Sequence, residues 1–95
     1  MDYLLDLGFN DNEIENLKSG FEPEVINMLL LFPKIVAVNY QILNEIGIKN
    51  IKEVFSKHIK MFLMNPDRFK AIFVKYDQAD LIRCIEKNAD IIEKL

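Results

Sequence analysis

The sequence predicts an all-α protein built from repeated helical units, and two observations support this prediction. The chain has only three glycines, three prolines and no threonine, and it is rich in Leu, Ile, Lys and Glu, which favours helix over sheet. A six-residue phrase occurs twice, as LLDLGF at residues 4–9 and as LNEIGI at residues 43–48. Each copy has the pattern of a helix C-terminus, where a glycine of positive φ follows the last apolar residue. The recurrence indicates a helical repeat.

Length and composition bound the class of protein. The 95 residues suit one domain (1–95), and 51% apolar with 28% charged residues is the balance of an ordered globule. The longest apolar stretch, 25–38, is broken by Pro33 and Lys34 and is shorter than the ~20 apolar residues of a membrane-spanning helix. A single cysteine, Cys84, allows no intrachain disulfide, and acids stand where a secretory signal carries bases. We therefore expect a cytoplasmic protein without a membrane span.

The first two helices are predicted from their ends. A helix over residues 2–7 ends at the first glycine phrase. Asn10 can cap a second helix, and Glu13, three residues later, completes a capping box. This helix is expected over about 11–19, because Gly20 stops it.

Two prolines open the next two helices. Pro23 suits a first helical position and predicts a helix to about Phe32. Because residues 28–32 are all apolar, this helix is either buried nearly all round or covered by a partner. Pro33 opens a fourth helix that ends at Gly47. Its predicted apolar stripe has helical spacing and consists of Ile35, Val38, Ile42 and Ile46.

The segment after the second glycine phrase is the clearest amphipathic stretch. A fifth helix is predicted from Lys49, and its apolar set is Ile51, Val54, Phe55, Ile59 and Phe62. Four bases fall on the opposite arc: Lys49, Lys52, Lys57 and Lys60.

The last two segments also begin at recognisable caps. Asn65 and Pro66 start a sixth helix, along which the apolar residues are Phe69, Ile72, Phe73 and Tyr76. Asp77 can cap the final segment, 78–95, as one helix or two, with the stripe Leu81, Cys84, Ile85, Ile92 and Leu95. We expect the aromatic residues of these stripes to pack in a core rather than to stack on bases.

A second sequence repeat, which we call the 30-residue echo, relates residues 51–62 to residues 81–92. The two copies align residue by residue: the first consists of Ile51, Val54, Phe55, His58, Met61 and Phe62, and the second of Leu81, Cys84, Ile85, Asn88, Ile91 and Ile92. His58 and Asn88 occupy the same position in an apolar stripe, where a long helix can break and a short one begin.

A unit of about thirty residues with a Leu-x-x-Leu-Gly-like stop, two antiparallel helices and a short third helix resembles the repeat of the mitochondrial transcription termination factor family. The resemblance covers nearly the whole chain as three units, 2–32, 33–65 and 66–95. The family usually has proline where this chain has His58 and Asn88. The resemblance implies a short right-handed α-solenoid-like array, whose concave surface binds nucleic acid in the best-known members.

The N-terminal third also resembles another family. Leu7-Gly8-Phe9, followed by residues 13–18 and 24–30, is similar to the loop and helices of a ubiquitin-associated domain. That resemblance implies ubiquitin binding, but it leaves residues 33–95 and the second glycine phrase unexplained.

No residue set indicates a catalytic or metal site. His58 and Ser56 are two positions apart on a helix, so their side chains point apart and form no nucleophile–base pair. His58 and Cys84 lack the paired spacing of metal ligands. Acids with partial calcium-loop spacing, at Asp11, Glu13, Glu15 and Glu22, lack the central glycine that the loop needs. We expect no enzyme activity, no cofactor and no small-molecule substrate.

Charge is divided unevenly along the chain. Residues 1–48 sum to −6 and residues 49–95 to +3, and the segment 49–75 alone sums to +5. This basic segment is either a solvated face or a surface for phosphates or an acidic partner. The candidate phosphate-contact residues are Lys49, Lys52, Lys57, Lys60, Arg68 and Lys70.

Two functions follow as expectations. The first is a non-catalytic interaction or scaffold module that binds a protein partner or forms a homodimer. Apolar residues near the chain ends and in the third helix are its candidate self-association contacts: Leu4, Leu5, Leu30, Ile92 and Leu95. The alternative is a nucleic-acid-binding regulator that uses the basic segment. The sequence specifies neither the partner nor the biological process.

Overall fold

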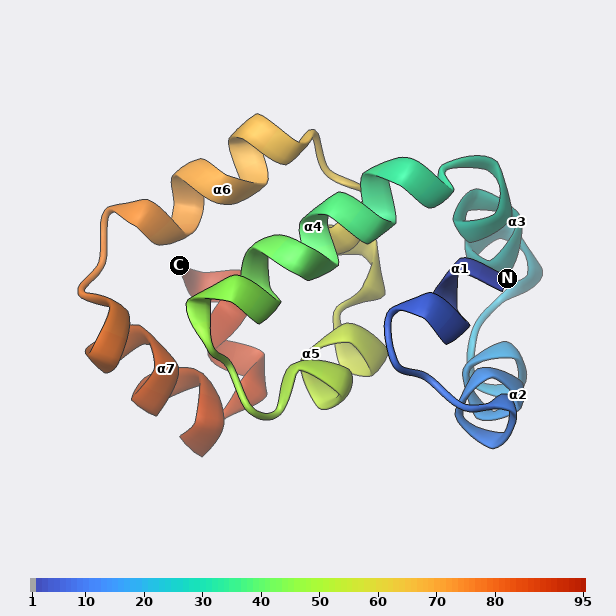
Figure 1. The fold of residues 1–95 in the computed structure, drawn as a ribbon, viewed down its shortest axis with the longest axis horizontal. Helices are drawn as coiled ribbons and strands as arrows, with labels where there is room; N and C mark the ends of the chain where they lie inside the picture. Colours follow the sequence, from blue (N-terminus) through green and yellow to red (C-terminus); the bar gives the residue numbers. More distant parts are fainter. Residues whose placement is uncertain (1) are drawn as a thin grey trace.

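The computed structural model describes residues 2–95, and all regular structure in this part of the chain is helical (Figure 1). The prediction of an all-α protein is therefore confirmed. The helices are α1 (Asp2–Asp6), α2 (Asp11–Gly20), α3 (Pro23–Leu31), α4 (Pro33–Ile46), α5 (Ile51–Lys57), α6 (Pro66–Val74) and α7 (Gln78–Lys87), with two 3-10 helices, η1 (Ile59–Leu63) and η2 (Ala89–Lys94).

The helix ends form where local sequence placed them. Gly8 and Gly47 have φ of 101° and 100°, the left-handed conformation that the glycine phrases predict. The capping box is present, since the Glu13 amide donates to the Asn10 side chain at 2.8 Å and the Asn10 amide donates to the Glu13 carboxylate at 3.0 Å. Asn65 and Asp77 cap α6 and α7 as predicted.

The order helix, helix, 3-10 helix occurs twice, as α4–α5–η1 and as α6–α7–η2. The breaks fall at His58 and Asn88, so the final segment is two helices rather than one. The 30-residue echo also holds in burial: Ile51, Phe55 and Phe62 are in the core, and so are their counterparts Leu81, Ile85 and Ile92.

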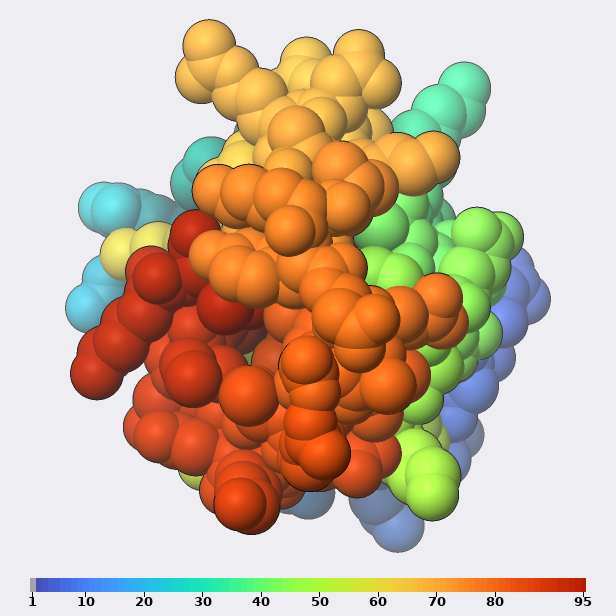
Figure 2. Space-filling model, turned by 90° about the vertical axis from the view of Figure 1, so that its left-hand side faces the viewer, coloured from blue at the N-terminus to red at the C-terminus, as the bar shows by residue number. Residues whose placement is uncertain are grey.

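Cys84 is the exception, because it is exposed although the stripe placed it beside Ile85. Its counterpart Val54 is fully buried. The difference follows from position, since α6, α7 and η2 lie at the surface at this end of the molecule (Figure 2), whereas α5 packs against α4, η1 and η2.

The helices follow one another along the longest axis of a molecule measuring 35 × 24 × 22 Å. In Figure 1, α1, α2 and α3 lie at one end, α4 and α5 in the middle, and α6 and α7 at the other end. The central helix α4 packs against α1, α3, α5, α6 and η1. No single helix within residues 2–95 is long and apolar enough to cross a membrane, and only α3 with α4, bent by 89°, reaches that length together.

A row of aromatic rings runs through the core and joins these parts. It consists of Phe9, Tyr40, Phe55, Phe62, Phe69 and Phe73, with centroids of successive rings 4.9–5.7 Å apart. All six are buried, and the tilted or edge-to-face angles are those that aromatic pairs prefer. Tyr76, predicted on the same stripe, is 40% exposed because α6 ends before it.

The buried face of α4 differs from the prediction. Its core residues are Val36, Asn39, Tyr40 and Leu43, whereas Val38 of the predicted stripe is 47% exposed and Ile35, Ile42 and Ile46 are half-buried. The helix has two apolar faces, and the inner one contains an asparagine that hydropathy alone assigns to the outside. Of the two alternatives given for α3, burial nearly all round is wrong, since Met28, Leu30, Leu31 and Phe32 are 43–71% exposed. Coverage by a partner stays a prediction.

Asn39 ties the middle of α4 to the end of η1. Its side chain is fully buried, and Nδ2 donates to the carbonyl oxygens of Phe62 and Met64, each at 2.8 Å. These carbonyls lie at the end of a 3-10 helix, where no further turn of helix supplies backbone N–H donors for them.

We predict that Asn39→Ala lowers the free energy of unfolding by about 2 kcal/mol or more, because two buried carbonyls lose their donors. Asn44→Ala, an exposed site on the same helix, is the matched control and should stay within about 0.5 kcal/mol. Urea denaturation of both variants measures the difference. Equal stability of the two variants would show that the Asn39 contacts contribute nothing.

Candidate functional site

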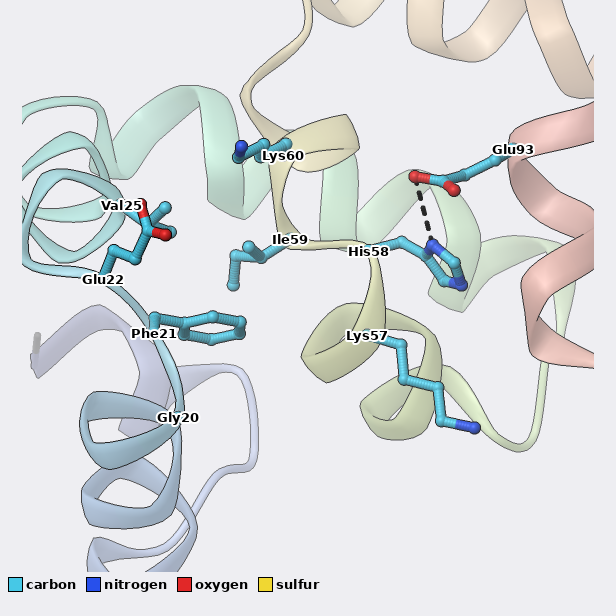
Figure 3. Close-up of a pocket in the computed structure, with 9 residues that line it drawn as sticks. All are labelled: Gly20, Phe21, Glu22, Val25, Lys57, His58, Ile59, Lys60 and Glu93. Carbon is cyan, nitrogen blue, oxygen red and sulfur yellow. Dashed lines mark ion pairs between the residues drawn. The ribbon is translucent and has the colours of Figure 1, made fainter.

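The hollow around His58 contains the only histidine of the chain. It lies between the α2–α3 connection and the break from α5 to η1, and has a volume of about 270 Å³ (Figure 3). Its lining is mixed: Gly20, Phe21, Glu22, Val25, Lys57, His58, Ile59, Lys60 and Glu93.

Both ring nitrogens of His58 face carboxylates from η2. Nε2 lies 3.0 Å from Asp90 Oδ1 and Nδ1 lies 3.3 Å from Glu93 Oε1, and Figure 3 draws the contact with Glu93. Ionised carboxylates only accept hydrogen bonds, so both contacts are satisfied when both nitrogens carry a proton. The His58 side chain is 7% exposed, and neither nitrogen faces a free position where a substrate proton could be taken. The arrangement attaches η2 to the break between α5 and η1.

The two nucleophilic side chains considered from the sequence, Ser56 and Cys84, are not paired with His58. Ser56 donates to the Lys52 carbonyl of its own helix, and Cys84 is exposed on α7. Among residues 2–95, no three His, Cys, Asp or Glu side chains are close enough together to hold a metal ion. The acids tested as a calcium loop lie on or beside α2, which is helical from Asp11 to Gly20.

The candidate phosphate contacts are divided among separate parts of the surface. Lys57 and Lys60 line the His58 hollow, Lys52 lines a second hollow with Glu13, and Lys70 lines a third beside α4. Lys49 lies in the turn before α5, and Arg68 lies on α6. In Figure 3 the side chains of Lys57 and Lys60 point away from each other. The sequence placed Lys49, Lys52, Lys57 and Lys60 on one arc of a single helix, but the break at His58 separates Lys60 on η1 from the other three.

Lys52 makes contacts within the molecule. Its ammonium group lies 3.0 Å from Glu13 Oε1 and 5.3 Å from the centroid of the Phe9 ring. The hydrogen bond from the Asn10 amide and then that from Lys52 hold the pKa of Glu13 below its ordinary value. This contact joins the acidic first half of the chain to its basic second half.

The candidate self-association residues differ in their exposure to solvent. Leu4 is fully buried and Ile92 is 1% exposed, so both belong to the core and are unavailable to another molecule. The reason is that the chain ends fold back onto the helices next to them. Leu95 is half-buried, whereas Leu5 and Leu30 are 47% and 51% exposed.

Part of the exposed apolar surface lies on the outer side of α4 and in the residues just before it. We use the term outer apolar face for its exposed residues Leu31, Phe32 and Val38 together with the half-buried Leu7, Ile35 and Ile42. Two hollows are lined by these residues, one by Leu7 and the middle of α4 and one by the start of α4. The spacing of Ile35, Val38 and Ile42 indicated an apolar stripe, but sequence alone assigned that stripe to the core.

Comparisons with family models, with curated proteins and with solved structures found no match to this chain.

We predict that His58→Phe, which keeps a ring but removes both ring nitrogens, lowers the free energy of unfolding by about 1–2 kcal/mol. Amide hydrogen exchange of Ala89–Lys94 should accelerate more than that of α4, because η2 loses its polar attachment. The double variant Asp90→Asn and Glu93→Gln should accelerate the same amides. Unchanged exchange in η2 would rule out this role for His58.

We also predict a pH-dependent effect of Glu13→Gln. A carboxyl with a lowered pKa in the folded state stabilises the fold above its unfolded pKa, and this stabilisation disappears as the pH falls through the folded pKa. The variant should melt at a lower temperature than the unmodified protein near pH 7, and the two should converge below about pH 4. Glu86→Gln, exposed and outside the ion pairs among residues 2–95, should follow the unmodified protein throughout. A constant gap across this range would contradict the role of Glu13.

Proposed function

We propose that this chain is a non-catalytic protein-interaction module, built as a short array of three helical units over residues 2–32, 33–65 and 66–95. Support for the array comes from the twofold order of helix, helix and 3-10 helix, from the two glycine stops and from the 30-residue echo. They are the local features on which the resemblance to the mitochondrial transcription termination factor family rests. A cytoplasmic location belongs to the same proposal.

The observation that carries the interaction role is the outer apolar face. Val38 is 47% exposed and Leu31 71% exposed, although both belong to continuous apolar sequence. The inner side of α4 already fills the core with Val36, Tyr40 and Leu43, each at most 3% exposed. Val38 therefore contributes little to folding, and contiguous exposed apolar surface is typical of binding sites.

The alternative function is nucleic-acid binding through the basic segment. The +5 charge of residues 49–75 and the family resemblance favour it. Against it, Lys52 is paired with Glu13, and Lys57 lies 4.0 Å from Glu53. We therefore place this function second.

We predict that the tagged chain captures a protein from a cell extract and that Leu31→Ser with Val38→Ser abolishes the capture. Tyr76→Ser, an exposed apolar-to-polar change beyond α6, is the control and should keep it. A gel-shift assay at about 50 and 200 mM salt tests the alternative, since phosphate binding weakens steeply with salt. Salt-sensitive nucleic-acid binding together with capture indifferent to Leu31 and Val38 would replace the proposed function by the alternative.

A further inference from the structure

The outer side of α4 has a basic residue at one end and an acidic residue at the other. We use the term α4 stripe for four residues that are all exposed: Lys34, Val38, Gln41 and Glu45. At about 100° per residue they fall within an arc of about 60°. The half-buried Ile35 and Ile42 flank this arc on one side. In Figure 1, α4 crosses in front of η1, against which it packs, so the opposite side of α4 faces the viewer.

Both charges of the stripe are placed unfavourably for the dipole of their own helix. Lys34 lies in the first turn of α4, which contains no acid, and Glu45 lies in the last turn, which contains no base. A helix dipole favours acids at its start and bases at its end. Glu45 and Lys70 line the same hollow, but no ion pair among residues 2–95 includes Lys34, Glu45 or Lys70. The charges of the stripe are therefore left for a partner to compensate.

The stripe is complementary to a second copy of itself. Positions 34 and 45, like positions 38 and 41, lie symmetrically about the point between residues 39 and 40. Two α4 helices packed antiparallel about that point place Lys34 of each copy level with Glu45 of the other. The two ion pairs lie about 16 Å apart, because eleven residues separate the charges and each adds ~1.5 Å. A parallel pair would instead bring like charges together.

Apolar contacts accompany the charges in this arrangement. A twofold axis keeps the same flank of both helices on one side, so Ile35 of each copy meets Ile42 of the other. Val38, which is 47% exposed, lies next to the axis. The Glu45 carboxylate of the second copy lies at the first turn of α4 and its Lys34 ammonium at the last turn. These are the placements that the dipole of α4 favours.

The residues beyond the two ends of the stripe also complement each other. At the Lys34 end, Leu31 and Phe32 are 71% and 44% exposed and line a hollow of about 350 Å³ together with Lys34. At the Glu45 end, Val74 of α6 is 67% exposed and lines a hollow of about 170 Å³ together with Glu45. Antiparallel packing brings the first end of each copy to the second end of the other. Exposed apolar residues outside α4 are thereby brought together as well.

We propose that this chain forms a homodimer in which two α4 helices pack antiparallel through their outer sides, with two ion pairs between Lys34 and Glu45. The inference rests on the proposed function and identifies the partner as a second copy of this chain. Val38, Ile35 and Ile42 supply the apolar contact, and the charges fix the direction of the two helices.

Charge reversal tests the pairing. Sedimentation of the unmodified chain at about 150 mM salt should show a mass that doubles with concentration. Lys34→Glu alone and Glu45→Lys alone should each weaken the dimer about tenfold or more, because both ion pairs become contacts between like charges. An equimolar mixture of the two variants should restore the affinity, because every such contact then joins opposite charges. Each reversal agrees with the dipole of α4, so both variants should stay folded, which circular dichroism verifies.

Matched controls lie on α7. Lys87→Glu and Glu86→Lys change the net charge by the same amounts at exposed positions outside the ion pairs of residues 2–95. Each should keep the affinity within about threefold, and mixing them should change nothing further. Equal weakening by the α4 and α7 reversals would overturn the proposal, because repulsion would then follow net charge alone.

The remaining outcomes separate this proposal from the proposed function. A mixture that associates no better than its two components would overturn the antiparallel pairing, and a dimer indifferent to both α4 reversals would place the interface elsewhere. A chain that stays monomeric at every concentration would also overturn the homodimer. In that case the interaction module stands if Leu31→Ser with Val38→Ser still abolishes capture from extract, and it fails if capture ignores this change.

Discussion

The row of aromatic rings is the constraint on which the other packing depends. Phe9 comes from the connection after α1, Tyr40 from α4, Phe55 from α5 and Phe62 from η1, and the row continues into α6. Each buried ring removes a large apolar area from water, worth about 2–3 kcal/mol, but only when its neighbours are in place. α5, with seven residues, and the two 3-10 helices are too short to be stable alone. Their stability comes from rings contributed by other parts of the chain, so these short helices depend on the rest of the core.

Polar contacts add specificity where apolar packing is indifferent. A 3-10 helix has few internal hydrogen bonds, and its position along α4 could shift by a residue at small hydrophobic cost. Asn39 fixes that position, because its amide reaches the carbonyls of Phe62 and Met64 in only one arrangement. His58 does the same for η2 through Asp90 and Glu93. One contact is buried and the other lies at the edge of a hollow, so the first should contribute more to stability.

Local signals allowed prediction of the helix ends but not of every buried face. Caps, prolines and glycines act within a few residues, and the ends at Gly47 and His58 formed where sequence placed them. The inner side of α4 is decided by what α1, α5 and α6 bring to it, which no local pattern contains. Its outer stripe, Ile35–Val38–Ile42, is more hydrophobic than the inner face, which includes Asn39. The sequence therefore predicted, wrongly, that the outer stripe faces the core. Cys84 was misplaced for a related reason, because the spacing of a stripe does not tell which of its residues a neighbouring helix covers.

The two apolar sides of α4 have different physical consequences. Val36 and Leu43 are fully buried and stabilise the fold, whereas Val38 at 47% exposure would lose little folding energy if it were polar. Exposed apolar surface lowers solubility, so the outer side of α4 carries a cost that the packing of the core does not require. The charge beside it is mixed, because Glu45 lines the hollow next to Val38 and Ile42 while Lys70 lies beyond Glu45. The inner side of α4 therefore supplies the packing of this helix, and exposed apolar surface remains on its outer side.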